Sequence, residues 1–261
     1  MPYFPPNQKP AAKLLQTVIA IMVLMLSACA ANPDKEDDMS KWSAEKLFEE
    51  AKTALKAEDY EAAIEAYETL EAQYPFGRYA EQAQLDTAYA YFKFDEPDTA
   101  IASADRFIKL HPRHNNVDYA YYLRGLASAS KNDNPMNFIA EQDPSLRDPS
   151  STQKSYDYFA ALIKKFPKSQ YAPDALKRMG YLRNDLAMHE IHVANYYANR
   201  GAYVAVANRA KYVISNFPRT PASRLALQLL ADAYKELKLD DLAADTQRVL
   251  QLNNDTKQTT P

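Results

Sequence analysis

The sequence predicts an all-α protein built from consecutive helix pairs. Its 261 residues include only 4 glycines, whereas alanine, leucine, glutamate and lysine, which favour helices, are abundant. A proline-containing junction recurs, and each copy follows a stretch in which apolar residues repeat with the helical period. The copies begin at Tyr74, His111, Phe166 and Phe217. Such self-similarity predicts an α-solenoid of about five helix pairs.

Each junction carries the signals that end one helix and begin the next. Proline ends the preceding helix because it lacks an N–H group and clashes with the turn before it. Two positions later stands a mostly small or polar residue that can cap the following helix. These residues are Gly77, His114, Ser169 and Thr220. Eight positions after each proline stands an alanine, where a small side chain lets two helices approach closely. These residues are Ala83, Ala120, Ala175 and Ala226.

Residues 1–28 have the pattern of a signal peptide and not of a folded segment. Lys9 and Lys13 give a positively charged start, and the mostly apolar stretch 14–26 has the length of a signal-peptide core. This stretch is too short for a comfortable membrane-spanning helix. We therefore expect the mature protein to lack residues 1–28.

The segment Leu26-Ser27-Ala28-Cys29 resembles the bacterial lipobox. The resemblance implies cleavage between Ala28 and Cys29, with an N-acyl group such as palmitate and an S-diacylglycerol on the cysteine. Cys29 is the only cysteine, which excludes a disulfide within one molecule. A plain secretory signal with an accidental cysteine is the alternative. The residue after the cysteine is Ala30 and not an aspartate. By analogy with Gram-negative lipoprotein sorting, this residue favours a periplasm-facing position on the outer membrane.

The mature chain is acidic. Without Lys9 and Lys13 it has 29 basic and 34 acidic residues, a formal net charge of −5. A basic footprint for nucleic acid is therefore absent. Residues 29–40 contain Pro33 and an acidic run, 34–38, which predicts a flexible tether.

The helical period divides residues 41–253 into five pairs and leaves a polar tail, 254–261, which we expect to be disordered. The predicted pairs are 41–75, 76–112, 113–167, 168–218 and 219–253. The prolines of the junctions are 37, 55 and 51 residues apart. The longer intervals require an insertion and a long helix. The insertion is visible at 131–149 as a run rich in Asn, Asp and Pro, which Phe138 and Ile139 can order in part. The long helix runs from about Pro173 to Asn199.

The first pair resembles a tetratricopeptide (TPR) repeat. Counted back from Pro75, alanines stand at −24 and −12, a tyrosine at −8 and a leucine at −5. The second pair, which ends at Pro112, repeats the pattern with Ala88, Ala100, Ala104 and Phe107. The first proline interval is also close to the TPR period of about 34 residues.

Catalytic and metal-binding motifs are weak. His189-Glu190-Ile191-His192 is the densest titratable cluster, but its histidines are three residues apart and no third metal ligand suggests itself. We interpret it as a solvated helix face. Neither a glycine-rich phosphate loop nor a Gly-x-Ser-x-Gly elbow occurs. We therefore expect no enzyme, no metal and no cofactor other than the lipid on Cys29. The 19 tyrosines fit packing between helices or, alternatively, a peptide-binding groove.

Several stretches resemble the BamD family, the TPR lipoproteins of the outer-membrane β-barrel assembly (BAM) machinery. They cover the mature chain nearly end to end. They are Tyr74-Pro75-Phe76-Gly77, Asp105-Arg106-Phe107-Ile108-Lys109-Leu110, Asp118-Tyr119, Leu123-Arg124-Gly125-Leu126, Arg147-Asp148-Pro149, Ser169-Gln170-Tyr171 and 200–209. A generic TPR array would not share the insertion or the Arg200-Gly201-Ala202 stretch. This chain departs from the family in its extended front end and lengthened tether.

The resemblance implies a binding scaffold. Members of the family bind the POTRA repeats of BamA and the lipoproteins BamC and BamE, and they meet unfolded outer-membrane protein precursors. A general periplasmic TPR adaptor that organises cell-wall enzymes is the alternative. The insertion at 131–149 and the stretch 200–209 favour the first interpretation.

The N-terminal half, 41–167, is the expected surface for precursors or BamC. Our candidates combine aromatic platforms with charges that can hold a peptide. They are Tyr74, Phe76, Asp86, Tyr91 and Arg106. Alternatively, Tyr74 and Phe76 pack the first junction.

The C-terminal half, 168–253, is the half in which the resemblance places BamA binding. Arg200 and Arg209 are the candidates, because Arg200-Gly201 predicts a turn and Arg209 is long enough to extend beyond the inward face of its helix. The alternative for Arg209 is an internal pair with Asp185 or Glu190.

Overall fold

The computed structural model describes residues 39–131 and 143–258. Cys29, the signal peptide and most of the tether lie outside the described residues, as do Phe138 and Ile139. The chain divides into two units, Met1–Ser43 and Ala44–Pro261. In the described part of the first unit, residues Met39–Lys41 form the short 3-10 helix η1. Among the described helices, none is long and apolar enough to cross a membrane.

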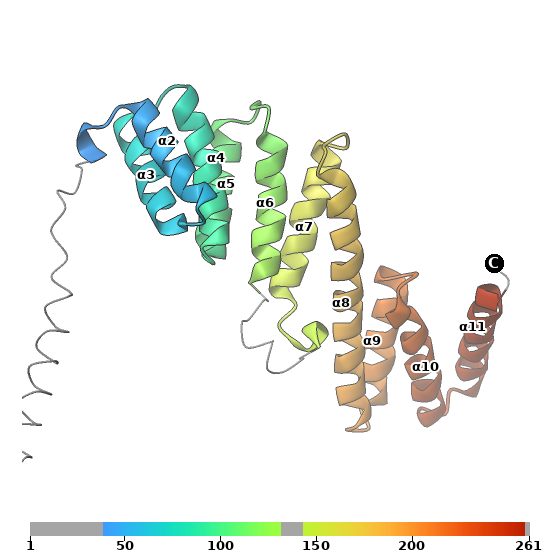
Figure 1. Ribbon diagram of the computed structural model, residues 1–261. Coiled ribbons are helices and arrows are strands. Elements are labelled where there is room, and N and C mark those ends of the chain that lie inside the picture. The colour runs from blue at the N-terminus through green and yellow to red at the C-terminus, as the bar shows by residue number, and fades with distance from the viewer. Residues whose placement is uncertain (1–38, 132–142, 259–261) are drawn as a thin grey trace, which may run out of the picture. The chain divides into compact units, whose positions relative to one another are not determined.

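The second unit contains ten α-helices and no strand among its described residues (Figure 1). The helices are α2 (Ala44–Lys56), α3 (Tyr60–Gln73), α4 (Arg78–Lys93), α5 (Pro97–Leu110), α6 (Val117–Ser130), α7 (Ser150–Lys165), α8 (Ala172–Ala198), α9 (Tyr203–Asn216), α10 (Pro221–Glu236) and α11 (Asp240–Gln258). Each helix packs against the next one along the chain. The prediction of an all-α solenoid of five helix pairs is confirmed. The last helix continues to Gln258, past the predicted boundary at 253.

Four of the pairs close with a short turn that has one residue in the left-handed conformation. These residues are Glu58, Asp95, Gly201 and Lys238, with φ between 61° and 71°. The third amide after the helix donates to the carbonyl five positions earlier, for example from Asp59 to Ala54 and from Glu96 to Tyr91. This bonding satisfies carbonyls that the helix end leaves open. The sequence predicted a turn at Gly201 and another at Glu58-Asp59, whereas the turns at Asp95 and Lys238 were not predicted, because these residues rarely adopt this conformation.

The junctions between pairs end their helices as predicted. Tyr74, His111, Phe166 and Phe217, which precede the junction prolines, are the C-caps of α3, α5, α7 and α9. The predicted cap residues of the next helix are at the N-cap at two of the four junctions, and at the other two the prediction is wrong. Gly77 and Thr220 occupy N-cap positions without a side-chain cap, and the Thr220 hydroxyl donates to the carbonyl of Phe217. His114 and Ser169 instead accept backbone N–H bonds from Asn116 and Tyr171, which lie in the turns before α6 and α8.

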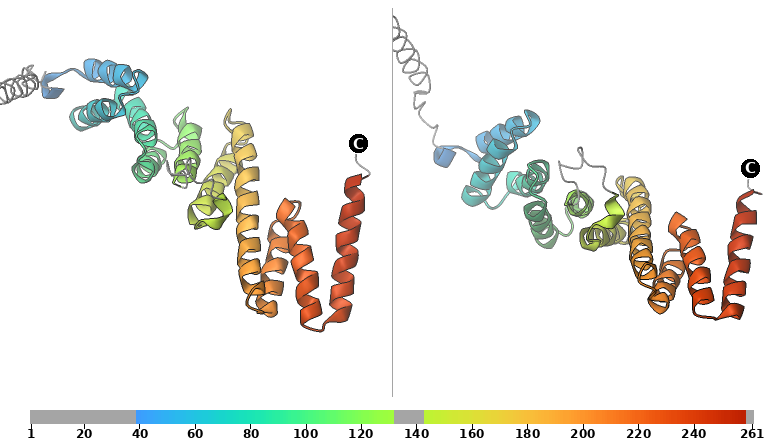
Figure 2. Two further views of the ribbon diagram at one scale, coloured as in Figure 1. Left: turned by 60° about the horizontal axis from the view of Figure 1, so that its bottom comes forward. Right: turned by 90° about the horizontal axis from the view of Figure 1, so that it is seen from below.

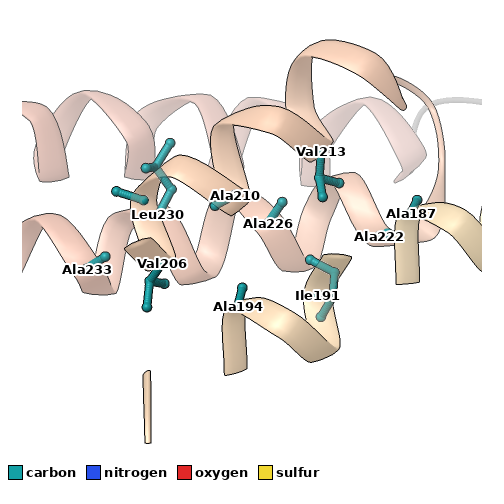
Figure 3. Close-up of a cluster of buried hydrophobic side chains, with 11 residues drawn as sticks. Ala187, Ile191, Ala194, Val206, Ala210, Val213, Ala222, Ala226, Leu230 and Ala233 are labelled. Atoms are coloured by element: carbon teal, nitrogen blue, oxygen red, sulfur yellow. The ribbon is translucent and has the colours of Figure 1, made fainter. Parts of the chain in front are cut away.

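The junction alanines are buried as expected. Ala83, Ala120, Ala175 and Ala226 have no exposed surface. Ala226 belongs to a cluster in which alanines and short branched side chains of α8, α9 and α10 meet (Figure 3). Small side chains let these three helices approach closely, so a larger side chain there would force them apart.

The helices of the fourth pair differ in length. α8 has 27 residues and α9 has 14, which correspond to about 40 Å and about 21 Å. The N-terminal half of α8 therefore extends beyond α9 (Figures 1 and 2). This long helix explains one of the enlarged proline intervals, as predicted.

Candidate binding surfaces

An open groove of about 290 Å³ lies where α3, α4 and α5 meet. It is lined by Glu68, Glu71, Ala72, Thr87, Tyr91, Ser103 and Arg106. Two of the predicted candidates, Tyr91 and Arg106, are therefore brought together. We call this surface the N-terminal groove.

The charges of the N-terminal groove already interact with one another. The hydroxyl of Tyr91 donates to Glu68, and Nη1 of Arg106 lies 3.7 Å from Oε2 of Glu71. Burial raises the pKa of Glu71, and the Arg106 guanidinium opposes this shift. Burial, followed by the hydrogen bond to Glu68, raises the pKa of Tyr91. Arg106 remains 66% exposed, so its guanidinium is open to a ligand.

Asp86 does not line the N-terminal groove. Its carboxylate accepts from the Tyr67 hydroxyl at 3.3 Å and from Nε2 of Gln82 at 2.8 Å. Burial raises the pKa of Asp86, and these two hydrogen bonds lower it. Because Tyr67 is fully buried, Asp86 links α4 to the interior of α3.

Tyr74 and Phe76 lie in the loop between α3 and α4. Phe76 is 91% exposed, so it does not pack the first junction. Tyr74 is 38% exposed. The loop ends at Gly77, whose φ of 115° is a conformation that glycine adopts without strain. The loop therefore presents Phe76 to the surroundings.

Arg209 forms the internal pair that we gave as the alternative. Its Nη1 atom lies 3.0 Å from Oε2 of Glu190 on α8. Glu190 is largely buried, with 17% of its side chain exposed, whereas 45% of Arg209 is exposed. Arg200 lies over the ring of Tyr196, 3.6 Å from its centroid. Each candidate arginine is thus positioned by a residue of α8.

The interpretation of 189–192 as a solvated helix face is wrong. Nδ1 of His189 lies 2.9 Å from the carbonyl oxygen of Ser145, and Nε2 of His192 lies 2.9 Å from the Ser145 hydroxyl and 3.2 Å from Asp143. Ile191 is buried. The histidines therefore dock the 3-10 helix η3 (Pro144–Leu146), the end of the insertion, onto α8. Hydrogen bonds from Ser145 hold the pKa of Asp143 below its usual range, and His192 adds to this effect.

Tyrosines in the middle of the chain pack between helices. Tyr122 of α6 stacks on Tyr171 with ring centroids 4.9 Å apart and donates to Asp174 of α8 at 2.5 Å. Arg124 lies against Tyr121 and Tyr158, 4.6 Å from each ring centroid. These contacts favour the packing interpretation for this group of tyrosines.

Gly125 has a packing reason that the sequence did not reveal. A Cβ atom at this position would lie 2.6 Å from two atoms of the fully buried Phe159 ring. The glycine therefore lets α6 and α7 approach closely. Across the described residues, no cluster of three His, Cys, Asp or Glu side chains is arranged to hold a metal ion.

Five helix pairs that pack in chain order and present open grooves define a helical-repeat protein. The chain belongs to the family described as YfiO, outer membrane lipoprotein, whose model matches residues 40–250.

Its relatives are assembly factors. It is 47% identical over 244 residues to the outer membrane protein assembly factor BamD of Neisseria gonorrhoeae, covering 92% of this chain and 91% of that protein. It is also 36% identical over 239 residues to the outer membrane protein assembly factor BamD of Vibrio cholerae. This match covers 91% of this chain and 98% of the Vibrio protein.

Among solved structures, the crystal structure of MamA matches 82% of this chain and 93% of that one, with a TM-score of 0.38 and 19% identity. A kinesin light chain with TPR-like repeats from Podospora anserina covers 86% of this chain and 99% of its own, with a TM-score of 0.35 and 12% identity.

Proposed function

We propose that this protein is a lipid-anchored subunit of the machinery that assembles β-barrel proteins into the outer membrane, where it acts as a non-enzymatic scaffold. The observation that carries this proposal is the 47% identity to an outer membrane protein assembly factor over 92% of the chain. The open grooves support a binding role, because a helical-repeat scaffold offers extended surfaces to its partners. Its partners would be the POTRA repeats of BamA, the lipoproteins BamC and BamE, and unfolded precursors.

The anchor would be the lipid on Cys29. Membership of an outer membrane lipoprotein family supports this assignment. In Cys29→Ala, acylation should disappear, as measured by incorporation of labelled palmitate, whereas Ser27→Ala should keep it because the lipobox accepts either small residue. Acylated and normally processed protein from Cys29→Ala would refute the anchor.

The precursor or BamC surface would comprise the N-terminal groove and the neighbouring loop. Tyr91 and Arg106 would hold a peptide through the tyrosine ring and the exposed guanidinium, while Phe76 would provide apolar area beside them. Asp86 would support this surface from inside, through Tyr67.

The BamA surface would include Arg200 and Arg209. An acidic residue of BamA would have to compete with Glu190 for Arg209, and the 45% exposure of Arg209 makes this exchange accessible. Glu190 would then hold the arginine in position until the partner arrives.

Affinity capture tests the proposal most directly. The full-length protein, purified in detergent, serves as bait for the POTRA region of BamA and, separately, for the cell's outer-membrane extract. We expect BamA to co-purify. Capture of cell-wall enzymes without BamA would overturn the proposal in favour of a general periplasmic adaptor.

A further inference from the structure

A second groove lies along the part of α8 that extends beyond α9. Its volume is about 340 Å³. It is lined by Lys177, Gly180, Tyr181, Arg183 and Asn184 of α8 and by Arg219 and Thr220, which lead into α10. Because α9 is much shorter than α8, the turn between α9 and α10 meets α8 at mid-length and leaves this face open (Figures 1 and 2). We call this surface the α8 groove.

The α8 groove is lined by three cations and no carboxylate. Arg183 donates from Nη2 to the carbonyl oxygen of Pro218 at 2.7 Å, which fixes its guanidinium at the turn while leaving its other donors available. Within the part of the chain that the structure describes, neither Lys177 nor Arg219 forms an ion pair. Three like charges that face the same space repel one another, and a ligand carboxylate would relieve that repulsion.

Arg219 occupies an unusual position. Its φ of 65° is left-handed, whereas Arg113 and Lys168, which follow the preceding junction prolines, do not have positive φ. The conformation is unfavourable for an L-residue. This turn thus places an arginine that makes no hydrogen bond or ion pair with the described residues beside the α8 groove.

Apolar side chains complete the surface. Tyr181 is 61% exposed, and Leu176, four residues before Gly180 on α8, is 57% exposed. Gly180 adds open space between them, because a Cβ there would meet no atom within 4 Å. The surface therefore combines cations with exposed apolar area at helical spacing.

We propose that the α8 groove binds an acidic segment of a protein partner, one in which carboxylate side chains alternate with apolar residues. The carboxylates would pair with Lys177, Arg183 and Arg219, and the apolar residues would cover Leu176 and Tyr181. Charge complementarity selects this occupant, since the groove offers donors and no acceptor carboxylate. The inference is independent of the proposed BamA and precursor surfaces, which involve other residues.

The test uses the full-length protein in detergent and a fluorescent, terminally blocked peptide of alternating glutamate and leucine. Fluorescence anisotropy should show binding that weakens as salt is raised, and the same peptide with glutamine in place of glutamate should not bind. Lys177→Gln combined with Arg219→Asn should weaken binding about fivefold or more, because two exposed charge pairs are lost. Asparagine tolerates the left-handed conformation, so the backbone at 219 should be preserved.

The matched control removes two exposed cations elsewhere in the same half. Lys211→Gln combined with Lys235→Gln should bind the peptide like the unmodified protein. The proposal is overturned if the acidic peptide does not bind, if both double variants weaken binding equally, or if the groove variant only abolishes binding to vesicles that contain phosphatidylglycerol. The last result would assign the groove to a lipid surface.

Discussion

The N-terminal groove and the α8 groove have similar volumes, about 290 and 340 Å³, but opposite charge. In the first, Glu68 and Glu71 face Tyr91 and Arg106, so its charges are largely satisfied within the protein. The lining of the second contains Lys177, Arg183 and Arg219 and no carboxylate. A charged ligand of the first groove must compete with internal partners, whereas in the second neither Arg183 nor Arg219 has a carboxylate partner among the described residues, and only Lys177 interacts with one, Asp174.

Helix length explains this difference. α3, α4 and α5 have 14, 16 and 14 residues, so their side chains meet along the whole groove and can pair across it. α8 is nearly twice as long as α9, so α9 can cover only about half of its length. The same repeat architecture therefore creates a self-paired surface where helices match and an unpaired surface where they do not.

The largest expected effect on stability compares one glycine from each region. Gly125→Ala would place a Cβ against Phe159, so the free energy of unfolding should fall by about 2 kcal/mol through overpacking. Gly180→Ala meets open space inside α8 and should raise that free energy by about 0.5–1 kcal/mol through helix propensity. Urea denaturation of both variants gives the comparison. Equal destabilisation would show that the α8 groove is not open at Gly180.

The next effect concerns Arg209. Because its pair with Glu190 is partly exposed, Arg209→Ala should lower the free energy of unfolding by at most about 1 kcal/mol. Capture of BamA should weaken at least about tenfold, since truncating one side of an interfacial charge pair costs about 2–5 kcal/mol. Glu190→Gln is the control, because it removes the internal partner and should leave capture unchanged or stronger. Unaltered BamA affinity in well-folded Arg209→Ala protein would reject this contact.

Local signals made the helix pairs predictable. The junction prolines ended their helices, and Ala83, Ala120, Ala175 and Ala226 proved to be fully buried, because both properties depend on residues close in sequence. The predicted capping roles of His114 and Ser169 were wrong, since these side chains cap the turn before the helix and not the helix itself.

Contacts between distant residues were harder to predict. His192 meets Asp143, 49 positions away, and no local pattern in 189–192 indicates that partner. The α8 groove was missed for the same reason, because it depends on where the turn at Arg219 meets a helix that is longer than its neighbour. The sequence predicted that Tyr91, Arg106 and Asp86 belong to one binding surface. Tyr91 and Arg106 do line one groove, whereas Asp86 belongs to the interior.

A smaller effect should appear as pH dependence in the N-terminal half. Burial raises the pKa of Asp86, so the folded protein keeps its proton to higher pH than the unfolded chain does. The free energy of unfolding contributed by this group should therefore fall as pH rises from about 4, the usual range of carboxyl groups, through its folded pKa. Asp86→Asn should flatten that slope while changing stability at pH 7 by less than about 1 kcal/mol, because the amide can still accept a hydrogen bond from Tyr67. Glu65→Gln, at an exposed position of α3, is the control, and an equal flattening there would contradict this assignment.

The smallest effect on stability is expected at Phe76. Its side chain is 91% exposed, so Phe76→Ala should change the free energy of unfolding by less than about 0.5 kcal/mol. If the ring is a platform for extended precursor segments, a photo-cross-linker at position 76 should trap precursor or BamC. In a second experiment the cross-linker is placed at Arg106, and Phe76→Ala should reduce the trapping there. A cross-linker at Tyr212, an exposed aromatic of α9, provides the comparison with the C-terminal half. Trapping at Tyr212 without trapping at Phe76 would move the precursor surface out of the N-terminal groove.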